Sequence, residues 1–245
     1  MFKVLEDMFI AGRDTVSHAL DWLGIYAILR YFTKKKVMIL MYHGVTAKDL
    51  VAGNYDTRHV HVKKFIWQVK YLRKHYSFIT FNDFMKWRSG KIKTLPPNPV
   101  IITFDDGYSN NYTQLFPILK ENRIPAMVYL MTGMIDKKNV AEYNIIQYCI
   151  VKAKKKEINI EGKIYPVSTP DQRMSAFHLL RDVAEKKDNV TKFLAEIKKE
   201  TGVSCSEAAD EDFAFMTWGQ CKDMQKEGVE FGSHTHSHSV LTKID

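Results

Sequence analysis

Two short stretches combine residue types that could do chemistry at a shared site. In the first, the apolar run 100–104 leads directly into Asp105, Asp106 and Gly107. The second contains three of the chain's nine histidines, namely His234, His236 and His238. Two histidines separated by three residues, with one aspartate from elsewhere, would offer the ligands that a first-row metal binds and leave positions for water and substrate. Each stretch alone has a plainer interpretation, since Asp-Gly is common in turns and a His-rich stretch can be a polar surface loop.

Both stretches follow a segment with the composition of a strand. Residues 100–104 are apolar and rich in β-branched side chains, which predicts a buried strand that ends at the Asp-Asp-Gly turn. A shorter apolar segment, 229–231, precedes the histidines. Because the loops at the carboxyl ends of strands converge on one crevice in α/β folds, an acidic strand end and a His-rich strand end together predict a metal site.

The rest of the chain supplies elements that would position these strand ends. Strands are predicted at 37–41, 77–80, 100–104, 126–131 and 229–231. Helical spacing and capping residues between them predict helices, for example at Phe65, Val69 and Leu72, after Thr80, and after Thr217. Alternation of strand and helix up to residue 135 predicts right-handed crossovers and a parallel sheet.

The pattern changes between residues 136 and 212. Lysine becomes frequent, Glu161-Gly162 predicts a small hairpin, and Thr169 with Pro170 and Gln172 predicts a helix start. A further helix is expected to end at Gly202. We interpret the region as an insertion that either caps the site and shapes substrate choice or forms a stabilising side lobe.

Residues 1–33 are expected to be helical, and Lys34-Lys35-Lys36 follows them directly. One interpretation is an interfacial helix whose basic end lies on anionic headgroups. The other is a helix packed on the domain. We favour this second interpretation because apolar and polar residues are no more sharply separated around the helix than in an ordinary core helix.

Composition limits the class of protein. The 245 residues have 45% hydrophobic content, which suits one large or two small globular domains. The net charge of +8 would suit anionic partners, but no stacking-aromatic or helix-turn-helix motif accompanies it, so we expect no nucleic acid partner. Three cysteines without motif spacing suggest a reducing compartment, and neither a signal-peptide layout nor a membrane-spanning run is evident. We therefore expect a cytoplasmic protein, with peripheral contact to the inner face of the membrane through residues 1–36 as an addition.

The two stretches also carry a family resemblance. Thr103–Gly107 and His234–His238 resemble the first two motifs of the polysaccharide deacetylases, the NodB-homology group of carbohydrate esterase family four. The flanking segments 38–45, 215–218 and 228–233 are similar to the family as well. The resemblance covers 37–135 and 213–243 and implies an α/β fold of the distorted (β/α)7-type barrel, incomplete at the C-terminus. The expected organisation is a helical segment at 1–36, a partial deacetylase domain at 37–135 and 213–245, and a mainly helical insertion at 136–212.

The resemblance implies a role for each residue of the two stretches. Asp106, His234 and His238 would bind a divalent metal, expected to be zinc, and Asp105 would be the general base. Adjacent residues at a strand end point in different directions, so one carboxylate can bind the metal while its neighbour reaches the attacking water. Thr235 and His43 are expected to contact substrate, and His236 is expected not to be a ligand. The implied reaction removes acetyl groups from N-acetylated sugars of a polysaccharide, an oligosaccharide or a glycan precursor.

The chain departs from the family pattern after the second motif. The family's later motifs, which supply a groove wall, an oxyanion contact and a general-acid histidine, do not appear between His238 and Asp245. We expect a fragment of a longer protein, with a partner-completed site or a degenerate member as alternatives. Two other functions stay open: hydrolysis of another non-peptide C–N bond, and a non-catalytic module that binds membrane or glycan.

Overall fold

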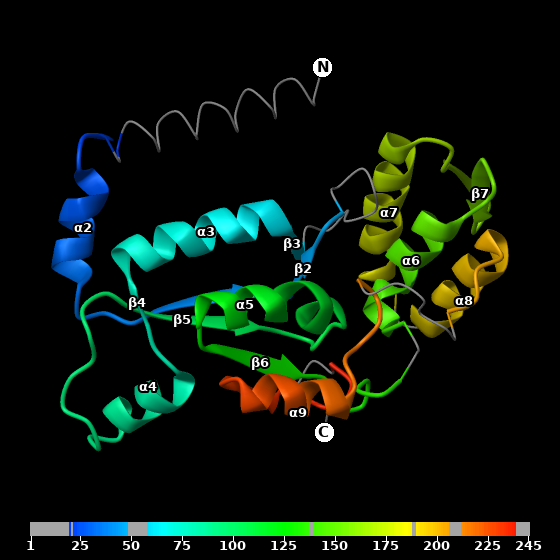
Figure 1. The fold of residues 1–245 in the computed structure, drawn as a ribbon. Coiled ribbons are helices and arrows are strands. Elements are labelled where there is room, and N and C mark those ends of the chain that lie inside the picture. The colour runs from blue at the N-terminus through cyan, green and yellow to red at the C-terminus, as the bar shows by residue number, and fades with distance from the viewer. Residues whose placement is uncertain are drawn as a thin grey trace.

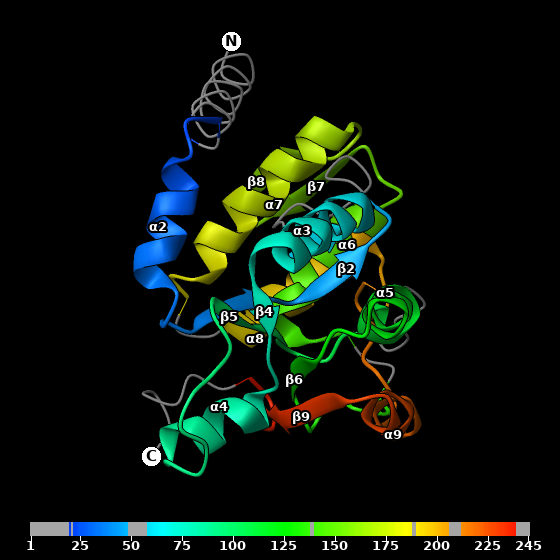
Figure 2. The ribbon, with the colours of Figure 1, turned by 60° about the vertical axis from the view of Figure 1, so that its left-hand side comes forward.

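The computed structural model describes residues 20, 22–48, 58–137, 140–187, 190–205 and 212–238, and Figures 1 and 2 show them as a parallel sheet flanked by helices, with a helical lobe beside it. The sheet has five parallel strands, and its main order is β1-β5-β6-β9, with β4 paired to the start of β5. The strands are β1 (Met38–Tyr42), β4 (Ser77–Phe78), β5 (Pro99–Phe104), β6 (Ala126–Leu130) and β9 (Val229–Ser233). All five strands predicted from the sequence therefore form one sheet.

The register of the sheet brings the carboxyl ends of its strands to one edge. Tyr42 pairs with Phe104, Phe104 with Val128, and Leu130 with Ser233. Within the described residues no pairing joins β1 to β9, so the sheet is open, as an incomplete barrel requires. The α/β class with a parallel sheet is confirmed.

Helices cover the sheet because each has one apolar face. On α3, Phe65, Val69 and Leu72 are buried at helical spacing against the strands. The Thr80 side chain accepts a hydrogen bond from the Asp83 amide at the start of α4, and a full capping box opens α9 at Thr217. The elements around the sheet are α3 (Val62–His75), α4 (Phe81–Arg88), the π-helical turn η2 (Asn111–Leu115), α5 (Phe116–Asn122) and α9 (Trp218–Lys226).

One pair of parallel strands was not predicted from the sequence. The short strands β2 (Gly44–Thr46) and β3 (His59–His61) pair with each other, and neither is among the strands predicted from the sequence. Residues 49–57 between them lie outside the described part of the chain. Strands of three residues have too few positions to show an alternating pattern, so only their tertiary pairing defines them.

Residues 140–205, here called the helical lobe, have a hydrophobic core of their own. Its buried members include Ile150, Phe177, Leu180 and Ile197, and Phe213 joins it from the chain's return to the sheet. The elements are η3 (Glu142–Asn144), α6 (Ile145–Lys152), the hairpin β7 (Glu157–Ile160) with β8 (Lys163–Pro166), α7 (Pro170–Ala184) and α8 (Val190–Thr201). The predicted hairpin, the capping box at Thr169 and the helix end before Gly202 are confirmed. The domain boundaries at 136 and 212 stay a prediction.

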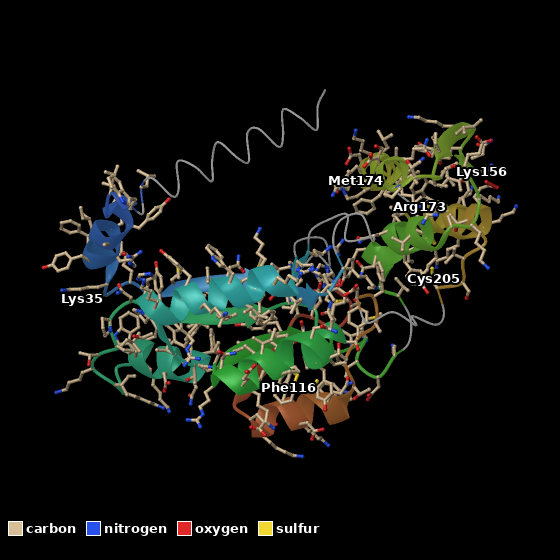
Figure 3. All side chains as sticks on the ribbon, turned by 45° about the horizontal axis from the view of Figure 1, so that its top comes forward. Lys35, Phe116, Lys156, Arg173, Met174 and Cys205 are labelled. Atoms are coloured by element: carbon tan, nitrogen blue, oxygen red, sulfur yellow. The ribbon has the colours of Figure 1, made fainter. Side chains whose placement is uncertain are left out.

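One polar side chain of the lobe closes the end of a helix. The Arg173 guanidinium, labelled in Figure 3, donates hydrogen bonds to the carbonyl oxygens of Val151, Ala153 and Val167 at 2.8–3.0 Å. Two of these carbonyls lie at the end of α6, where helix geometry leaves backbone acceptors without intrahelical donors. The buried thiols of Cys149 and Cys205 are 3.7 Å apart and both are free cysteines.

The helix α2 (Ile25–Thr33) is the described part of the N-terminal helical segment. None of its side chains is buried, and Figure 1 shows it at the opposite end of the molecule from the lobe. The Arg30 side chain donates to the Tyr71 hydroxyl at 2.9 Å, which ties α2 to α3. The interpretation of this segment as a helix packed on the domain therefore stays a prediction, and its described part contacts α3 without burying any side chain. Across the part of the chain that the structure describes, no helix is both long and apolar enough to span a bilayer.

Candidate metal centre

Asp106, His234 and His238 come together at the carboxyl edge of the sheet. The Asp106 Oδ1 atom lies 3.6 Å from His234 Nε2 and 3.6 Å from His238 Nε2. One potential ligand atom from each residue lies within 4.8 Å of the other two. Asp106 comes from the loop after β5 and both histidines from the loop after β9, although these strands are separated by more than a hundred residues of sequence. The structure thus unites the three residues that the sequence proposed as ligands, whose role stays a prediction.

The surroundings of Asp106 fit a bound cation. Its side chain is 1% exposed, and its Oδ1 atom has no hydrogen-bond partner in the described residues. A buried carboxylate oxygen without a partner is costly, because burial removes the water that would otherwise solvate the charge. A divalent ion at this position would satisfy that oxygen, and one carboxylate with two imidazoles is a suitable donor set for a first-row metal.

The backbone at both loops adopts an uncommon conformation. Asp106, Thr235 and His238 have positive φ angles of 73°, 66° and 62°, in the left-handed region that favours glycine. Gly107 also has a positive φ of 77°, and a Cβ atom there would lie only 2.6 Å from a Leu130 methyl carbon. Residues held in this conformation cluster at functional sites, where the surrounding structure enforces it.

Hydrogen bonds tie both loops to the carboxyl end of β6, which lies between them in the sheet. The His234 amide donates to the Leu130 carbonyl at 2.7 Å, and the Met131 amide donates to the Asp106 carbonyl at 3.3 Å. The Thr235 hydroxyl accepts a hydrogen bond from the His238 amide at 2.9 Å. This bond orients the histidine loop, so Thr235 positions a proposed ligand whether or not it also contacts substrate.

Asp105 and His43 lie beside the three residues. The Asp105 amide donates to the Tyr42 carbonyl at 2.8 Å, which fixes the start of the loop. Burial raises the pKa of the Asp105 carboxyl above its ordinary value, and the positive potential of His234 and His43 opposes that shift. His43 follows β1 directly and is close enough to influence Asp105. The catalytic role of Asp105 and the substrate contact of His43 stay predictions.

His236 lies apart from the metal group. Its carbonyl accepts a hydrogen bond from the Gly133 amide at 2.8 Å, and its ring lies so close to Gly133 that a Cβ atom there would be 2.7 Å from Nε2. It does not belong to the group of residues whose atoms could hold a cation. This arrangement agrees with the sequence expectation that the middle histidine is not a ligand.

An aromatic contact from the helical lobe reaches His238. The Tyr143 ring, on η3, lies 4.9 Å from the His238 ring, and its hydroxyl is 3.1 Å from the Tyr108 hydroxyl. The Arg58 guanidinium lies 4.9 Å from the centre of the Tyr143 ring and donates to the Asn144 side-chain oxygen at 3.0 Å. Burial raises the pKa of both tyrosine hydroxyls, which are therefore neutral hydrogen-bonding groups. These residues have no recognisable sequence pattern, because only tertiary structure brings η3 to the histidine loop.

A buried polar cluster supports the loop that follows Asp106. The Asn110 side chain donates to Asp212 at 2.9 Å and contacts His59 Nδ1 at 2.8 Å, and the Thr46 hydroxyl donates to Asp212 at 3.1 Å. Gly44 passes so close that a Cβ atom there would collide with the side chains of His59 and Asn110. The cluster joins β2, β3 and the segment that returns from the lobe to the sheet. It therefore helps to fix the position of the loop that follows Asp106.

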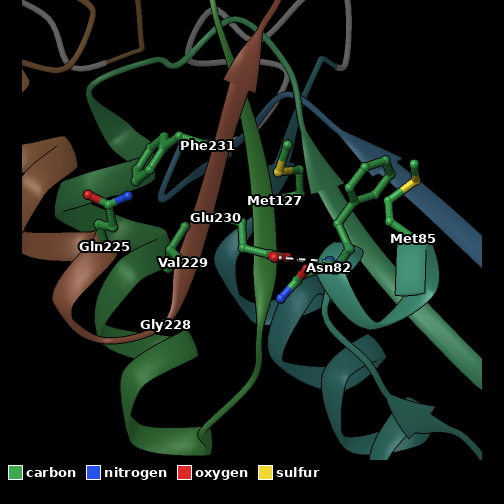
Figure 4. Close-up of a pocket in the computed structure, with 9 residues that line it drawn as sticks. Asn82, Met85, Met127, Gln225, Gly228, Val229, Glu230 and Phe231 are labelled. Carbon is green, nitrogen blue, oxygen red and sulfur yellow. Dashed lines mark hydrogen bonds between the residues drawn. The ribbon is translucent and has the colours of Figure 1, made fainter. Parts of the chain in front are cut away.

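A pocket of about 500 Å³ lies away from this centre, near the amino end of β9. Figure 4 shows its lining, in which Glu230 projects from β9 toward α4. The Glu230 carboxylate accepts hydrogen bonds from the Phe81 and Asn82 amides, so it caps α4 with a negative charge at the helix amino end. The pocket contains none of the proposed site residues, and the capping role accounts for its one carboxylate.

Comparison with known proteins identifies the family. The sequence profile of the family "Polysaccharide deacetylase" matches residues 92–245, well over half of the chain. This match includes both motif loops and the three residues of the metal group. The chain belongs to the polysaccharide deacetylase family.

Relatives of known function resemble the chain over different lengths. A poly-beta-1,6-N-acetyl-D-glucosamine N-deacetylase of Staphylococcus epidermidis is 28% identical over 239 residues, which cover 87% of this chain and 77% of the relative. The protein with the same name in Staphylococcus aureus is 32% identical over 80 residues, which cover 32% of this chain and 27% of that protein.

Two solved structures are similar in fold. The Streptococcus pyogenes deacetylase PplD in complex with acetate has a TM-score of 0.49 and 17% identity over 87% of this chain and 62% of its own. The de-N-acetylase from Aggregatibacter actinomycetemcomitans has a TM-score of 0.46 and 19% identity over 82% of this chain and 55% of its own. The chain therefore spans less than two thirds of the length of these two solved proteins.

Proposed function

We propose that this chain is a metal-dependent hydrolase that removes acetyl groups from N-acetylated sugars of a glycan. One observation supports the proposal above the others: the buried Asp106 oxygen without a hydrogen-bond partner, 3.6 Å from two imidazole nitrogens, directly beside the Asp105 carboxylate. Family membership supports the reaction class. The S. epidermidis relative is named for a polymer of β-1,6-linked N-acetylglucosamine, and we propose the same substrate class here.

In this proposal the residues divide the work by position. Asp106, His234 and His238 would hold a divalent ion, for which zinc is our proposal, and the ion would polarise the acetamide carbonyl and acidify water. The Asp105 carboxylate accepts the proton of the attacking water. The C–N bond breaks as the nitrogen takes up the proton that Asp105 accepted from water, which gives a free amino sugar and acetic acid that ionises to acetate. His43 and Thr235, at the two sides of the carboxyl edge, are proposed to contact the sugar.

The proposal is tested by acetate release from β-1,6-linked N-acetylglucosamine oligosaccharides. The purified chain is stripped with a chelator, assayed, reloaded with Zn²⁺ and assayed again, beside Asp105→Asn. We expect activity only after reloading, and a loss of roughly 100- to 10,000-fold in the variant, the range typical of a general base. Asp223→Asn, which changes an exposed aspartate on α9, is the matched control and should leave the rate unchanged.

Two outcomes would contradict the proposal. Acetate release that persists in Asp105→Asn would remove this residue from the reaction. Stoichiometric metal binding without release from any acetylated glycan tested would favour the alternatives, hydrolysis of another non-peptide C–N bond or a non-catalytic glycan-binding module. A panel of cyclic amides would then separate these two alternatives.

A further inference from the structure

Helix α2 presents its apolar stripe to solvent instead of to the sheet. Ile25, Ile28, Leu29 and Phe32 have the i, i+3, i+4, i+7 spacing of a helix face that normally packs against a core. In the described structure all four side chains are exposed, Ile28 and Leu29 by 53% and Phe32 by 77%. Trp22, which precedes the helix and its left-handed Gly24, is 86% exposed as well.

The opposite side of α2 makes the contacts with the domain. Arg30 is half-buried and bonds to Tyr71 on α3, and the Lys34 carbonyl accepts a hydrogen bond from the Asn98 amide. The helix is thus fixed by its polar side, with its apolar side turned outward. A contiguous exposed apolar surface of this kind marks a site of interaction with a protein or a membrane.

The charges around the stripe favour an anionic surface as the occupant. Lys34, Lys35 and Lys36 follow the helix and are all exposed, and Arg30 lies within it. Residues 22–36 include no aspartate or glutamate. A second copy paired in parallel would bring these cations close to their own copies and an antiparallel copy would offer them no acidic partner on α2, whereas anionic headgroups would attract them. Exposed aromatic residues beside lysines are also typical of helices that lie in a membrane interface.

We propose that α2, with Trp22 and Lys34–Lys36, docks this chain on the surface of an anionic lipid bilayer. A nine-residue helix is about 13 Å long, against about 30 Å of hydrocarbon, so it lies in the interface and does not cross it. Its apolar stripe enters the boundary between headgroups and acyl chains, and the lysines contact the headgroups.

The position of α2 decides how the docked protein is oriented. The helix leads into the amino end of β1, at the left of Figure 1, whereas the metal group lies at the carboxyl edge of the sheet. The five residues of β1 alone separate the two ends by roughly 16 Å. The docked chain would therefore turn its candidate metal centre away from the bilayer.

The test is sedimentation of the full chain with vesicles of phosphatidylcholine, with and without phosphatidylglycerol. We expect binding to the anionic vesicles that weakens as salt is added. The variant Ile28→Ser, Leu29→Ser, Phe32→Ser should lose binding. Replacing Lys34, Lys35 and Lys36 by Gln should weaken it roughly 100-fold, because each lysine near an anionic surface contributes about fivefold.

Matched controls come from the helical lobe. Replacing the exposed Lys154, Lys155 and Lys156 by Gln removes the same charge far from α2, as the separation of Lys35 and Lys156 in Figure 3 illustrates. Ile164→Ser with Leu179→Ser removes apolar side chains of similar exposure. Both controls should bind like the unaltered chain, and thermal unfolding verifies that every variant is folded.

Three results would overturn the proposal. The first is no binding of the unaltered chain to anionic vesicles. The second is equal weakening by the Lys34–Lys36 and Lys154–Lys156 variants, which would indicate general charge attraction. The third is a dimer in sedimentation equilibrium that the serine variant dissociates, without vesicle binding, which would assign the stripe to a second copy. None of these readouts depends on acetate release, so the proposed function stands or fails separately.

Discussion

The sheet region and the helical lobe are both built around buried apolar cores, yet among the described residues the three that could hold a metal all follow strands of the sheet. The sheet core joins residues from Val45 to Val229, so its strands come from distant parts of the sequence. The lobe core runs only from Val140 to Phe213. In the sheet the polar residues follow strand ends and meet at one edge, whereas the lobe's Arg173 and Thr169 close helix ends. Distant strands that share an edge can assemble a site, and local helices mainly stabilise themselves.

The lobe reaches the site through one short element. Tyr143 on η3 lies against His238, and its hydroxyl contacts Tyr108 in the loop after β5. Everything else in the candidate metal centre comes from the sheet region. The comparison therefore predicts that changes in the sheet region affect metal binding strongly, and that changes in the lobe affect it only through this contact.

The largest effect is expected from Asp106→Asn. The amide cannot provide the charged oxygen, so divalent metal affinity should fall by more than the roughly 10- to 100-fold that is typical when an outer-shell partner is lost. Calorimetric titration of the chelator-treated chain with Zn²⁺ measures the change. His236→Gln is the control and should bind metal normally. Equal affinity in Asp106→Asn and the unaltered chain would exclude Asp106 as a ligand.

Next come two phenylalanines, one in each core. Phe65→Ala and Phe177→Ala each remove a fully buried ring and should lower the free energy of unfolding of their own region by about 3–5 kcal/mol. Phe65 packs against Tyr42 and Phe104, the residues that end the strands before the site. Only the first variant should therefore also weaken metal binding.

Hydrogen exchange locates the destabilised region in each variant, and Zn²⁺ titration reports the site. Phe65→Leu and Phe177→Leu serve as conservative controls and should lower the free energy of unfolding by less than the alanine variants. If Phe177→Ala weakened metal binding as much as Phe65→Ala, the two cores would be one cooperative unit and the comparison would be wrong.

A smaller effect is expected from Tyr143→Ala. Aromatic pairs contribute about 0.5–1.5 kcal/mol beyond their buried area, so losing the ring beside His238 should weaken metal binding about 2- to 10-fold. Tyr143→Phe keeps the ring and removes only the hydroxyl, and should bind metal nearly as well as the unaltered chain. The reverse order, with Phe as harmful as Ala, would show that the hydroxyl network and not the ring orients His238.

The smallest effects are expected from exposed ion pairs, one in each region. Lys120 bonds to Glu227 at 2.7 Å on the sheet side, and Lys187 bonds to Glu161 at 2.6 Å in the lobe. Because both pairs are partly in water, Lys120→Gln and Lys187→Gln should each lower the free energy of unfolding by about 0–1 kcal/mol and leave metal affinity unchanged. Denaturant unfolding measures the stability of both variants, and Zn²⁺ titration measures their metal affinity. A loss comparable to that of Phe65→Ala in either variant would contradict this ranking.

Features that depend on local sequence could be predicted. The apolar run before Asp105, the capping boxes at Thr169 and Thr217 and the glycine after α8 each act within a few residues, and the structure confirms them. The approach of Asp106 to His234 and His238 was inferred because the ends of parallel strands share an edge.

Features that depend on tertiary contacts could not be predicted. Tyr143 and Arg58 have no local pattern, because their role arises only where the lobe meets the sheet. Strands β2 and β3 are too short to show a period. The stripe on α2 has the spacing of a core helix, and periodicity does not tell toward which side such a stripe turns.

At Asp106, stability and metal binding favour different residues, because the left-handed backbone and the buried position both disfavour an aspartate in the absence of metal. A glycine there would relax the backbone by about 1–2 kcal/mol and would remove a buried charge. In the absence of metal, the chain should therefore become more stable when this ligand is lost. In a lineage that no longer needs the site, replacement of Asp106 would then be favoured for two reasons, the relaxed backbone and the removed buried charge. A retained aspartate at position 106 in a divergent homologue would accordingly be a sensitive indicator that selection still acts on metal binding.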